Sequence, residues 1–227
     1  MKRFFLIRHG QSLANVRYIT DSTPYIFDGD IPLTEKGTEE ASATANFLKT
    51  YCKENKLDLK KAILWVSPFL RTEETAKIIN EKLKITKLYQ DPRLTEMDFG
   101  LFDQKALLDC EKIDKQLFNN LQFRNASVRG KFYARRPNGE SPADVYTRIS
   151  TFIETVYRDK TIENVFIISH GITLRALIMR LMHYNLEWYF NEKNAGNCSV
   201  RLIEGTPLTD KGYIHGTAIN QTIVITK

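Results

Sequence analysis

The sequence alternates short runs of consecutive apolar residues with stretches of helical pattern. The apolar runs lie at 3–8 (RFFLIR), 62–66 (AILWV) and 164–169 (NVFIIS). A run of this length without polar alternation is typical of a strand that is buried on both faces. When helices separate such strands, the strands pair mostly in parallel and the helices cover both faces of the sheet. The sequence therefore predicts an α/β fold, a three-layer αβα sandwich with a mostly parallel central sheet.

Four helices are predicted between and after these strands. Their expected extents are about 34–51, 67–83, 141–158 and 172–183. Thr34 is the expected N-cap of the first helix, and Ser67-Pro68 is a cap and first-turn pair for the second. Ser141 begins a capping box for the third. Two further strands are expected over 198–203 and 221–226.

One stretch, 104–136, does not follow this alternation. Its basic residues are Arg124, Arg129, Lys131, Arg135 and Arg136, together with lysines nearer its start. No repeat and no linker rich in Pro, Gly or Ser marks a domain boundary. A length of 227 residues suits one large domain or two small ones. We therefore expect a single domain over 1–227, with 104–136 as a lid or insertion over one edge of the sheet.

Charge and hydropathy exclude several classes of protein. Lys and Arg number 33 against 27 Asp and Glu, and the formal net charge of +6 suits an anionic partner. The apolar start covers only residues 4–7, which is too short for a signal peptide or a membrane span. We therefore expect a cytoplasmic protein with no membrane partner.

Several kinds of cofactor and metal site are excluded by motif. The cysteines at 52, 110 and 198 are odd in number and far apart, so no disulfide framework or paired metal motif is visible. The histidines show no His-Glu-x-x-His spacing, which argues against a zinc site on a helix. Neither Gly-x-Gly nor Gly-Lys-Ser/Thr occurs, which excludes a dinucleotide fingerprint and a P-loop. We expect no metal and no cofactor.

Polar and charged residues follow the three strongest strands at the point where each ends. They are Arg8-His9-Gly10, the segment 67–71 (SPFLR) and Ser169-His170-Gly171. Ligands of open α/β sheets bind beyond the carboxyl ends of the strands, where helix N-termini also point. The glycine after each histidine allows a sharp turn and close approach to a ligand. An arginine in the first turn of a helix, as expected for Arg71, opposes the helix dipole unless an anion compensates. The pattern favours a phosphate site.

Each of these residues also has a structural interpretation. A single histidine after a strand is more often structural, but two His-Gly pairs that each close an apolar run favour function. Arg8 ends an apolar run and would be costly to bury without an anionic partner. Taken alone, Glu96 would be interpreted as an ordinary solvated carboxylate in a loop, and only its neighbours in sequence suggest that it has a function.

Five segments, in this order, resemble the histidine phosphatase superfamily, which includes the phosphoglycerate mutases and fructose-bisphosphatase-type enzymes. They are RHGQSLAN at 8–15, LTEKG at 33–37, SPFLRTEETA at 67–76, LTEMDFGLFD at 94–103 and SHG at 169–171. Arg-His-Gly alone is a weak signal, whereas five ordered segments spread over roughly residues 3–204 are a specific one.

The resemblance implies a role for each matched position. His9 would be the nucleophile that becomes phosphohistidine, and Glu96 would be the acid that protonates the leaving oxygen and then the base that activates water. The residues implied to bind the phosphoryl group are Arg8, Asn15, Arg71, His170 and Gly171. Phosphoryl transfer depends mainly on positioning and on neutralising charge. Two guanidiniums and one imidazolium would supply the charge that other phosphotransferases obtain from magnesium, so no metal is required.

The chain departs from the family pattern after Glu96. Gln104 replaces a glycine, and ALLDCEKIDKQLF at 106–118 stands where mutases carry a glycine-rich stretch and a long basic insertion. The segment 135–141 (RRPNGES) resembles a turn of the phosphatase branch, which would bring Arg135, Arg136 or both to the substrate. A solvated loop with a helix cap is the alternative interpretation of that segment.

Phosphomonoester hydrolysis is the function these observations favour. It would run through a phosphohistidine on a small anionic phosphorylated metabolite, and phosphoglycerate mutase-type transfer is the alternative. An alternative of another class is a non-catalytic nucleic-acid or anion-binding protein, suggested by the charge of +6 and the basic stretch 124–136. Mixed charges and the lack of a recognition motif argue against nucleic acid as a partner. The sequence does not predict the oligomeric state.

Overall fold

The structure is a computed structural model that describes residues 2–16, 27–103, 111–112 and 115–219. Its centre is a six-stranded sheet in which the strand order is β3-β2-β4-β1-β6-β7. The strands are β1 Arg3–Arg8, β2 Ala62–Val66, β3 Leu88–Gln90, β4 Asn164–Ser169, β6 Val200–Glu204 and β7 Thr209–His215. The first four pair in parallel, whereas β6 pairs antiparallel with both β1 and β7. A short ribbon joins β5 Asn194–Ala195 to β8 Ala218–Ile219.

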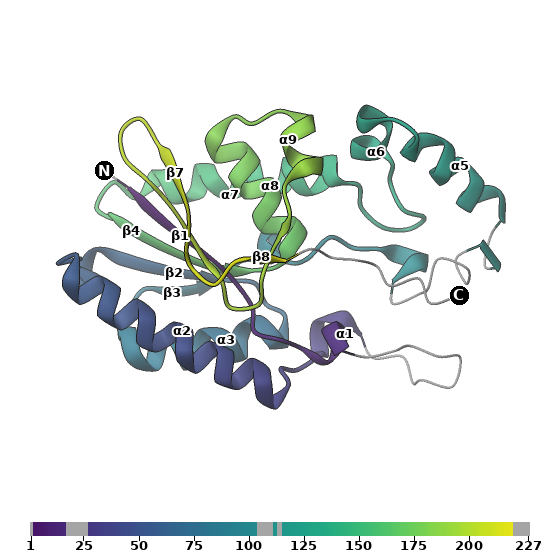
Figure 1. Cartoon of the computed structure of the whole chain (residues 1–227). Helices are drawn as coiled ribbons and strands as arrows, with labels where there is room; N and C mark the ends of the chain where they lie inside the picture. The colour runs from purple at the N-terminus through teal and green to yellow at the C-terminus, as the bar shows by residue number, and fades with distance from the viewer. Residues whose placement is uncertain (1, 17–26, 104–110, 113–114, 220–227) are drawn as a thin grey trace.

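Two pairs of long helices cover the two faces of this sheet (Figure 1). One face carries α2 Glu35–Glu54 and α3 Leu70–Leu83, and the other carries α7 Pro142–Arg158 and α8 Gly171–Met182. Shorter helices are α1 Leu13–Val16, α5 Lys115–Asn125, α6 Val128–Tyr133 and α9 Leu186–Asn191. Single 3-10 turns are η1 Asp28–Asp30, η2 Leu59–Lys61, η3 Pro92–Leu94 and η4 Gly100–Phe102. The predicted three-layer αβα architecture is confirmed.

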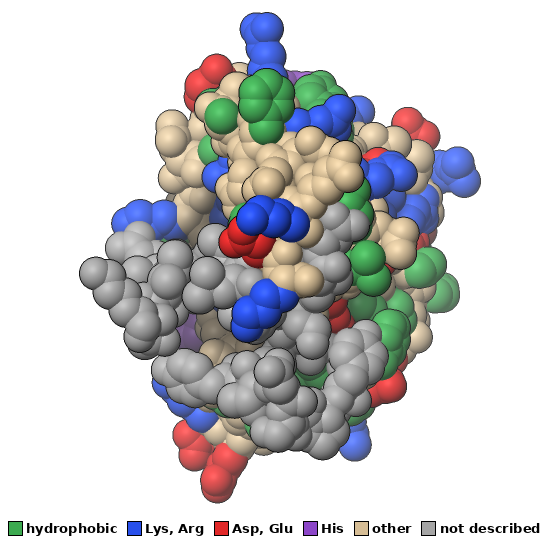
Figure 2. Space-filling view, turned by 90° about the vertical axis from the view of Figure 1, so that its right-hand side faces the viewer, with side chains coloured by type: hydrophobic (Ala, Val, Ile, Leu, Met, Phe, Trp, Pro, Cys, Tyr) green, Lys and Arg blue, Asp and Glu red, His purple; other side chains and the backbone are tan. Residues whose placement is uncertain are grey.

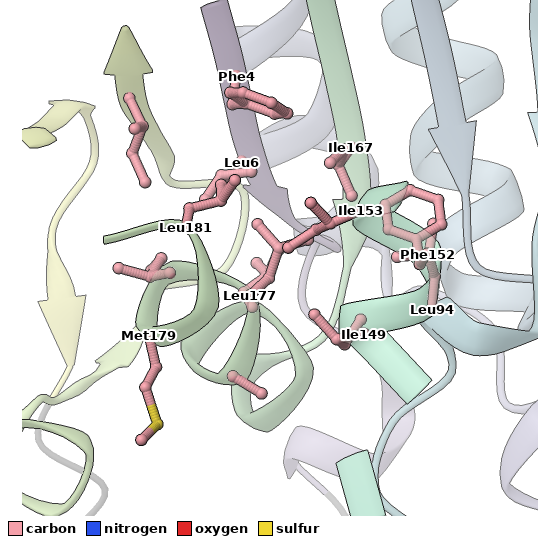
Figure 3. Packing of buried hydrophobic residues seen from close by; sticks show 14 of the residues in the cluster. Phe4, Leu6, Leu94, Ile149, Phe152, Ile153, Ile167, Leu177, Met179 and Leu181 are labelled. Carbon is pink, nitrogen blue, oxygen red and sulfur yellow. The ribbon is translucent and has the colours of Figure 1, made fainter. Parts of the chain in front are cut away.

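Strand β1 shows why its sequence is apolar at consecutive positions. Phe4 and Leu6 pack into the core beneath α7 and α8, as Figure 3 shows, while Phe5 and Ile7 pack into the core beneath α2 and α3. Successive side chains of a strand point to opposite faces, so a strand between two helical layers needs apolar residues at every position. Burying each such side chain contributes about 1.5–3 kcal/mol.

Most of the predicted capping signals are confirmed. The Thr34 side chain accepts a hydrogen bond from the backbone N–H of Gly37, and Ser141 forms the full capping box with Asp144. The expectation for Ser67-Pro68 was wrong, because α3 begins at Leu70 with Phe69 as its N-cap. The Ser67 side chain instead contacts the ring of His170.

The predicted extents of the later elements need small corrections. Helix α8 begins at Gly171, one residue before the expected start, and the strand expected over 198–203 is β6, Val200–Glu204. Strands β3 and β7 were not predicted. The strand expected over 221–226 lies outside the described residues.

The described part of 104–136 is helical and stands beside the sheet layers, at the right of Figure 1. Phe132 of α6 is buried and contacts the rings of Tyr146 and Tyr189, so it anchors this segment on α7 and α9. None of the residues of α5 is buried.

Among the described residues, no helix has the length and apolar character needed to cross a membrane. The cytoplasmic location stays a prediction.

Candidate active site

The ends of β1, β2 and β4 meet at one rim of the sheet. The backbone N–H of His9 donates to the Ser169 carbonyl (3.0 Å), and that of Ser67 donates to the Ile168 carbonyl (3.1 Å). These bonds continue the strand pairing by one residue and fix where each strand end turns. They bring the rings of His9 and His170 to a centroid separation of 5.1 Å, with both rings buried. Residues 161 positions apart in sequence therefore face one small volume.

The proton on the His9 ring is placed by a backbone acceptor. The Gly10 carbonyl accepts a hydrogen bond from Nδ1 at 2.7 Å, and since a carbonyl cannot donate, the lone pair lies on Nε2. Burial, followed by the charges of Arg8 and Arg71, holds the pKa of His9 well below its usual range. A Cβ on Gly10 would lie 2.4 Å from the Gly37 carbonyl oxygen, so only glycine fits this turn. His9 is thus a neutral imidazole with Nε2 available for attack.

Two buried guanidiniums stand beside the histidines. Arg8 donates from Nη1 to the Ala195 carbonyl (2.8 Å), and its buried Nε has no partner among the described residues. Burial lowers the pKa of Arg8. Arg71 lies 4.9 Å over the Phe69 ring and donates from Nη1 and Nη2 to the two carboxylate oxygens of Asp28, at 3.1 and 2.9 Å. The two arginines give the rim a positive charge that an oxyanion would balance.

His170 is the N-cap residue of α8. Its Nε2 lies 2.8 Å from the Ser67 hydroxyl, while its buried Nδ1 has no hydrogen-bond partner in the described part of the chain. Its ring meets that of Phe69 edge to face at 5.1 Å. Burial, followed by the charges of Arg71 and His9, holds the pKa of His170 well below its usual range. This environment favours a neutral ring at position 170 over the imidazolium expected from the sequence.

The Glu96 carboxylate lies at the N-terminus of α8. Oε2 accepts from the backbone N–H of Ile172 (3.2 Å), and Oε1 accepts from Met97 N (3.0 Å) and from both the N–H and the hydroxyl of Thr173 (3.2 Å each). These bonds hold the carboxyl group in place at the positive end of the α8 dipole. A cavity of about 390 Å³ adjoins this carboxylate. Its lining includes Asp28, Phe69, Glu96, Phe99 and Arg148.

Asn15 and Gly171 take places close to the two histidines. The Asn15 side-chain oxygen accepts from the Ser12 N–H (3.0 Å) and from Asn197 Nδ2 (3.1 Å). Asn197 Nδ2 also donates to the His9 carbonyl (3.2 Å), so Asn15 is linked through this amide to the loop that carries His9. Gly171 is the first residue of α8, directly after His170.

The family model of the histidine phosphatase superfamily (branch 1) matches residues 4–212. The chain belongs to this superfamily. It is 30% identical over 227 aligned residues to phosphoglycerate mutase-like protein AT74H of Arabidopsis thaliana, covering 89% of this chain and 74% of the relative. It is 32% identical to putative phosphoserine phosphatase 2 of Hydrogenobacter thermophilus, covering 89% and 90%.

Solved structures share the fold of this chain. The α-ribazole phosphatase from Shigella flexneri superposes with a TM-score of 0.75 at 22% identity, covering 96% of this chain and 98% of that one. The histidine pair, Arg8, Arg71 and Glu96 of the present chain lie in the segments that carried the resemblance.

The two arginines of the 135–141 turn have different environments in this superfamily member. Arg135 has a side chain that is 65% exposed, and it pairs with both oxygens of Asp144 in the capping box of α7. That pairing lowers the pKa of Asp144 to about 2. Arg136 is half-buried 5.1 Å over the ring of Phe99, a cavity residue, and pairs with no carboxylate in the described part of the chain. The structure places Arg136, and not Arg135, against a residue that lines the cavity.

Three site residues were missed by sequence reasoning. Asp28 engages Arg71, 43 positions away. Arg148 pairs with Glu140 and donates to the Glu96 carbonyl (3.1 Å), so it holds the loop that carries Glu96. Ser67 belongs to the strand-end segment 67–71, but it was interpreted as a helix cap. Its position directly after an apolar run was the one available signal, and no local pattern marks the other two.

No cofactor or metal is assigned to this chain. Within the described ranges, no group of three or more His, Cys, Asp or Glu side chains is placed to hold a metal ion. The expectation of a metal-free reaction stays a prediction.

Proposed function

We propose that the protein is a phosphomonoester hydrolase that works through a phosphohistidine at His9 on a small anionic phosphorylated metabolite. The observation that carries the proposal is the neutral His9 ring, with Nδ1 bound to the Gly10 carbonyl, inside a buried set of cationic and polar groups. Membership of a superfamily whose members include phosphatases supports the same reaction class.

In the first step, His9 Nε2 attacks phosphorus and the bond from phosphorus to the ester oxygen breaks. The Glu96 carboxyl group gives a proton to the leaving oxygen, and the alcohol departs. In the second step, ionised Glu96 takes a proton from water, the water oxygen bonds to phosphorus, and the bond to Nε2 breaks. Inorganic phosphate leaves, and both His9 and Glu96 return to their starting forms.

The groups around His9 suit the charge of this transition state. Arg8 and Arg71 would neutralise the phosphoryl oxygens, which is the main catalytic requirement of phosphoryl transfer. Two buried nitrogens without a partner among the described residues, Arg8 Nε and His170 Nδ1, would gain one from a bound phosphoryl group. A buried polar group without a partner is costly, so binding of an oxyanion would relieve that cost.

Arg136 supports a substrate with a second anionic group, such as a carboxylate or another phosphate. Its guanidinium packs on Phe99 at the wall of the cavity of about 390 Å³, which suits a small metabolite. The segment 104–136 of this single domain would form the lid, with α6 held in place by Phe132. Hydrolysis is preferred over mutase transfer because the chain lacks the mutase-type insertion after residue 103.

Nucleic-acid binding is less well supported. On the face shown in Figure 2, described Lys and Arg side chains lie among Asp and Glu side chains, whereas a nucleic-acid site gathers basic residues on one face or stripe. A small phosphoester therefore remains the proposed partner.

The test is rapid quenching with a phosphomonoester carrying a labelled phosphoryl group, followed by the partition of label between water and added glycerate. We expect a protein-bound label that is labile in acid and stable in alkali, and release of label as inorganic phosphate. Label transferred mainly to glycerate would show a mutase instead. Absence of bound label together with absence of turnover on a panel of phosphorylated metabolites would overturn the proposal.

A further inference from the structure

Ser67 makes a contact that its expected role as a helix cap does not explain. It follows β2 directly, and its side chain is fully buried (0% exposed). Its Oγ lies 2.8 Å from His170 Nε2, and the Phe69 backbone N–H donates to the same oxygen at 3.4 Å. The hydroxyl therefore joins the end of one strand to the histidine that follows another.

The direction of the bond between Ser67 and His170 follows from counting donors and acceptors. A serine hydroxyl has one proton to donate and two lone pairs. One lone pair receives the Phe69 N–H, and His170 Nε2 is the only acceptor within hydrogen-bond reach of Oγ among the described residues. A buried hydroxyl proton without an acceptor is costly, so the hydroxyl donates to Nε2. Nε2 then carries the lone pair, and the ring proton sits on Nδ1.

Nδ1 is also the ring nitrogen that the protein leaves unpaired. It is buried and has no hydrogen-bond partner among the described residues. The His170 ring lies 5.1 Å from that of His9, so a phosphoryl group on His9 would be close to it. With its proton on Nδ1, His170 is a donor toward a phosphoryl oxygen, while the other tautomer would present a lone pair to an anion.

We propose that Ser67 is a positioning residue that fixes His170 in the tautomer with the proton on Nδ1, so that this neutral ring donates to the transferring phosphoryl group. The proposal rests on the proposed function. The two histidines are then set to opposite tasks by chemically opposite partners. A carbonyl acceptor leaves His9 with a free lone pair on Nε2, and a hydroxyl donor leaves His170 with a free proton on Nδ1.

The first test is a long-range nitrogen–proton correlation spectrum of the full chain labelled with 15N at histidine. The signals of His170 are assigned by their loss in His170→Gln. We expect protonated Nδ1 and unprotonated Nε2 at neutral pH. A wild-type spectrum with the proton on Nε2 would overturn the proposal. This measurement does not depend on the folding of a Ser67 variant.

The second test is Ser67→Ala, with folding checked by circular dichroism. We expect the ring proton to move toward Nε2. Removing one oxyanion-hole donor costs about 10²–10³ in kcat, and loss of the bias alone should lower kcat by about 10- to 100-fold with a smaller change in KM. Ser67→Thr, which keeps the hydroxyl, should retain the Nδ1–H tautomer and a kcat within about threefold of wild type. An unchanged tautomer and kcat in Ser67→Ala would refute the role.

Ser199→Ala is the matched control, because Ser199 is equally buried but donates only to the Gly196 carbonyl. It should change neither the tautomer nor kcat. The spectrum is recorded without substrate, so it separates the two hypotheses. A protein that has the Nδ1–H tautomer but forms no phosphoenzyme would refute the proposed function and, with it, the catalytic purpose of the Ser67 contact. A phosphoenzyme with the opposite tautomer would refute the Ser67 proposal alone.

Discussion

Asp28 binds Arg71 through both carboxylate oxygens and leaves one edge of the guanidinium open. Nη1 and Nη2 donate to Oδ1 and Oδ2 at 3.1 and 2.9 Å, and Nη1 also donates to the Asp28 carbonyl at 2.5 Å. The Nε–H has no partner among the described residues. Arg71 is thus held from one side while its Nε edge stays available for a phosphoryl oxygen, and the same carboxylate reduces the positive charge of the site.

Asp28→Asn should therefore strengthen the binding of inorganic phosphate. Asparagine keeps the shape of the side chain and one acceptor for Arg71 but removes a negative charge close to the anion. Charges a few ångströms apart near a protein surface interact by a few kcal/mol. We therefore expect the binding free energy of phosphate to become more favourable by about 1.4 kcal/mol, which is a tenfold fall in its inhibition constant. Competitive inhibition at constant ionic strength measures it. Weaker phosphate binding would show that orientation of Arg71 outweighs charge.

Glu96→Gln should affect substrates according to their leaving group. An alkyl phosphate needs its leaving oxygen protonated, whereas a nitrophenyl phosphate does not. We expect kcat for the alkyl ester to fall by about 10²–10⁴, the range of general acid catalysis, and the phosphorylation step for the nitrophenyl ester to change little. Pre-steady-state phosphorylation rates across esters of graded leaving-group pKa provide the measurement. An equal loss for all esters would contradict the role of proton donor.

Arg136→Gln and Arg135→Gln form a matched pair. Arg136 packs on the cavity residue Phe99, while Arg135 is exposed and pairs with Asp144. We expect Arg136→Gln to raise KM about tenfold for a substrate with two anionic groups and to leave KM for nitrophenyl phosphate unchanged. Arg135→Gln should leave the KM for both substrates unchanged and should lower stability only slightly, because an exposed ion pair contributes little. Equal effects of the two variants would contradict the assignment of Arg136 to a second anion.

Stability should fall as the pH drops below about 6.5, the ordinary pKa of histidine. Burial and neighbouring arginines lower the pKa of His9 and of His170 in the folded state, so the unfolded chain binds more protons there. The contribution of the two rings to the free energy of unfolding is fully present above the pKa of the unfolded state. It is lost as the pH falls below that value, by up to about 1.4 kcal/mol per pH unit for each ring. Urea unfolding at pH 7.5 and 5.5 measures this loss, and His170→Gln should reduce the slope. A stability that is flat over this interval would contradict two neutral buried rings.

The pairing of Arg135 with Asp144 acts in a separate window. The pKa of Asp144 in the folded state is lowered to about 2. The contribution of this carboxylate to stability is therefore present above about pH 4 and is lost as the pH falls toward 2. It therefore does not contribute to the slope between pH 7.5 and 5.5.

The central strands could be predicted because their burial on two faces imposes consecutive apolar residues. All six residues of β4 are buried, for example. Strands β3 and β7 lie at the two edges of the sheet, and neither contains a buried residue. Their sequences therefore carry no apolar run, and only the neighbouring strands specify them.

The candidate site was predictable where its residues sit at strand ends. His9 and His170 belong to segments whose position in an α/β sheet fixes where they meet. Contacts between residues far apart in sequence were not predictable. Asp28 contacts Arg71 only in the folded chain. Ser67 lies in a capping pattern, although its hydroxyl binds His170. Arg135 and Arg136 are adjacent in sequence, and only the capping box at Asp144 separates their environments.

The most direct test of the account is to locate the phosphoryl group on the enzyme. Glu96→Gln should slow hydrolysis of the intermediate, so a nitrophenyl phosphate should load the protein with phosphate. Digestion at neutral to alkaline pH, followed by mass spectrometry with a fragmentation method that preserves phosphohistidine, should place the group on His9. Phosphate on another residue, or turnover in His9→Ala equal to that of the wild type, would contradict the account.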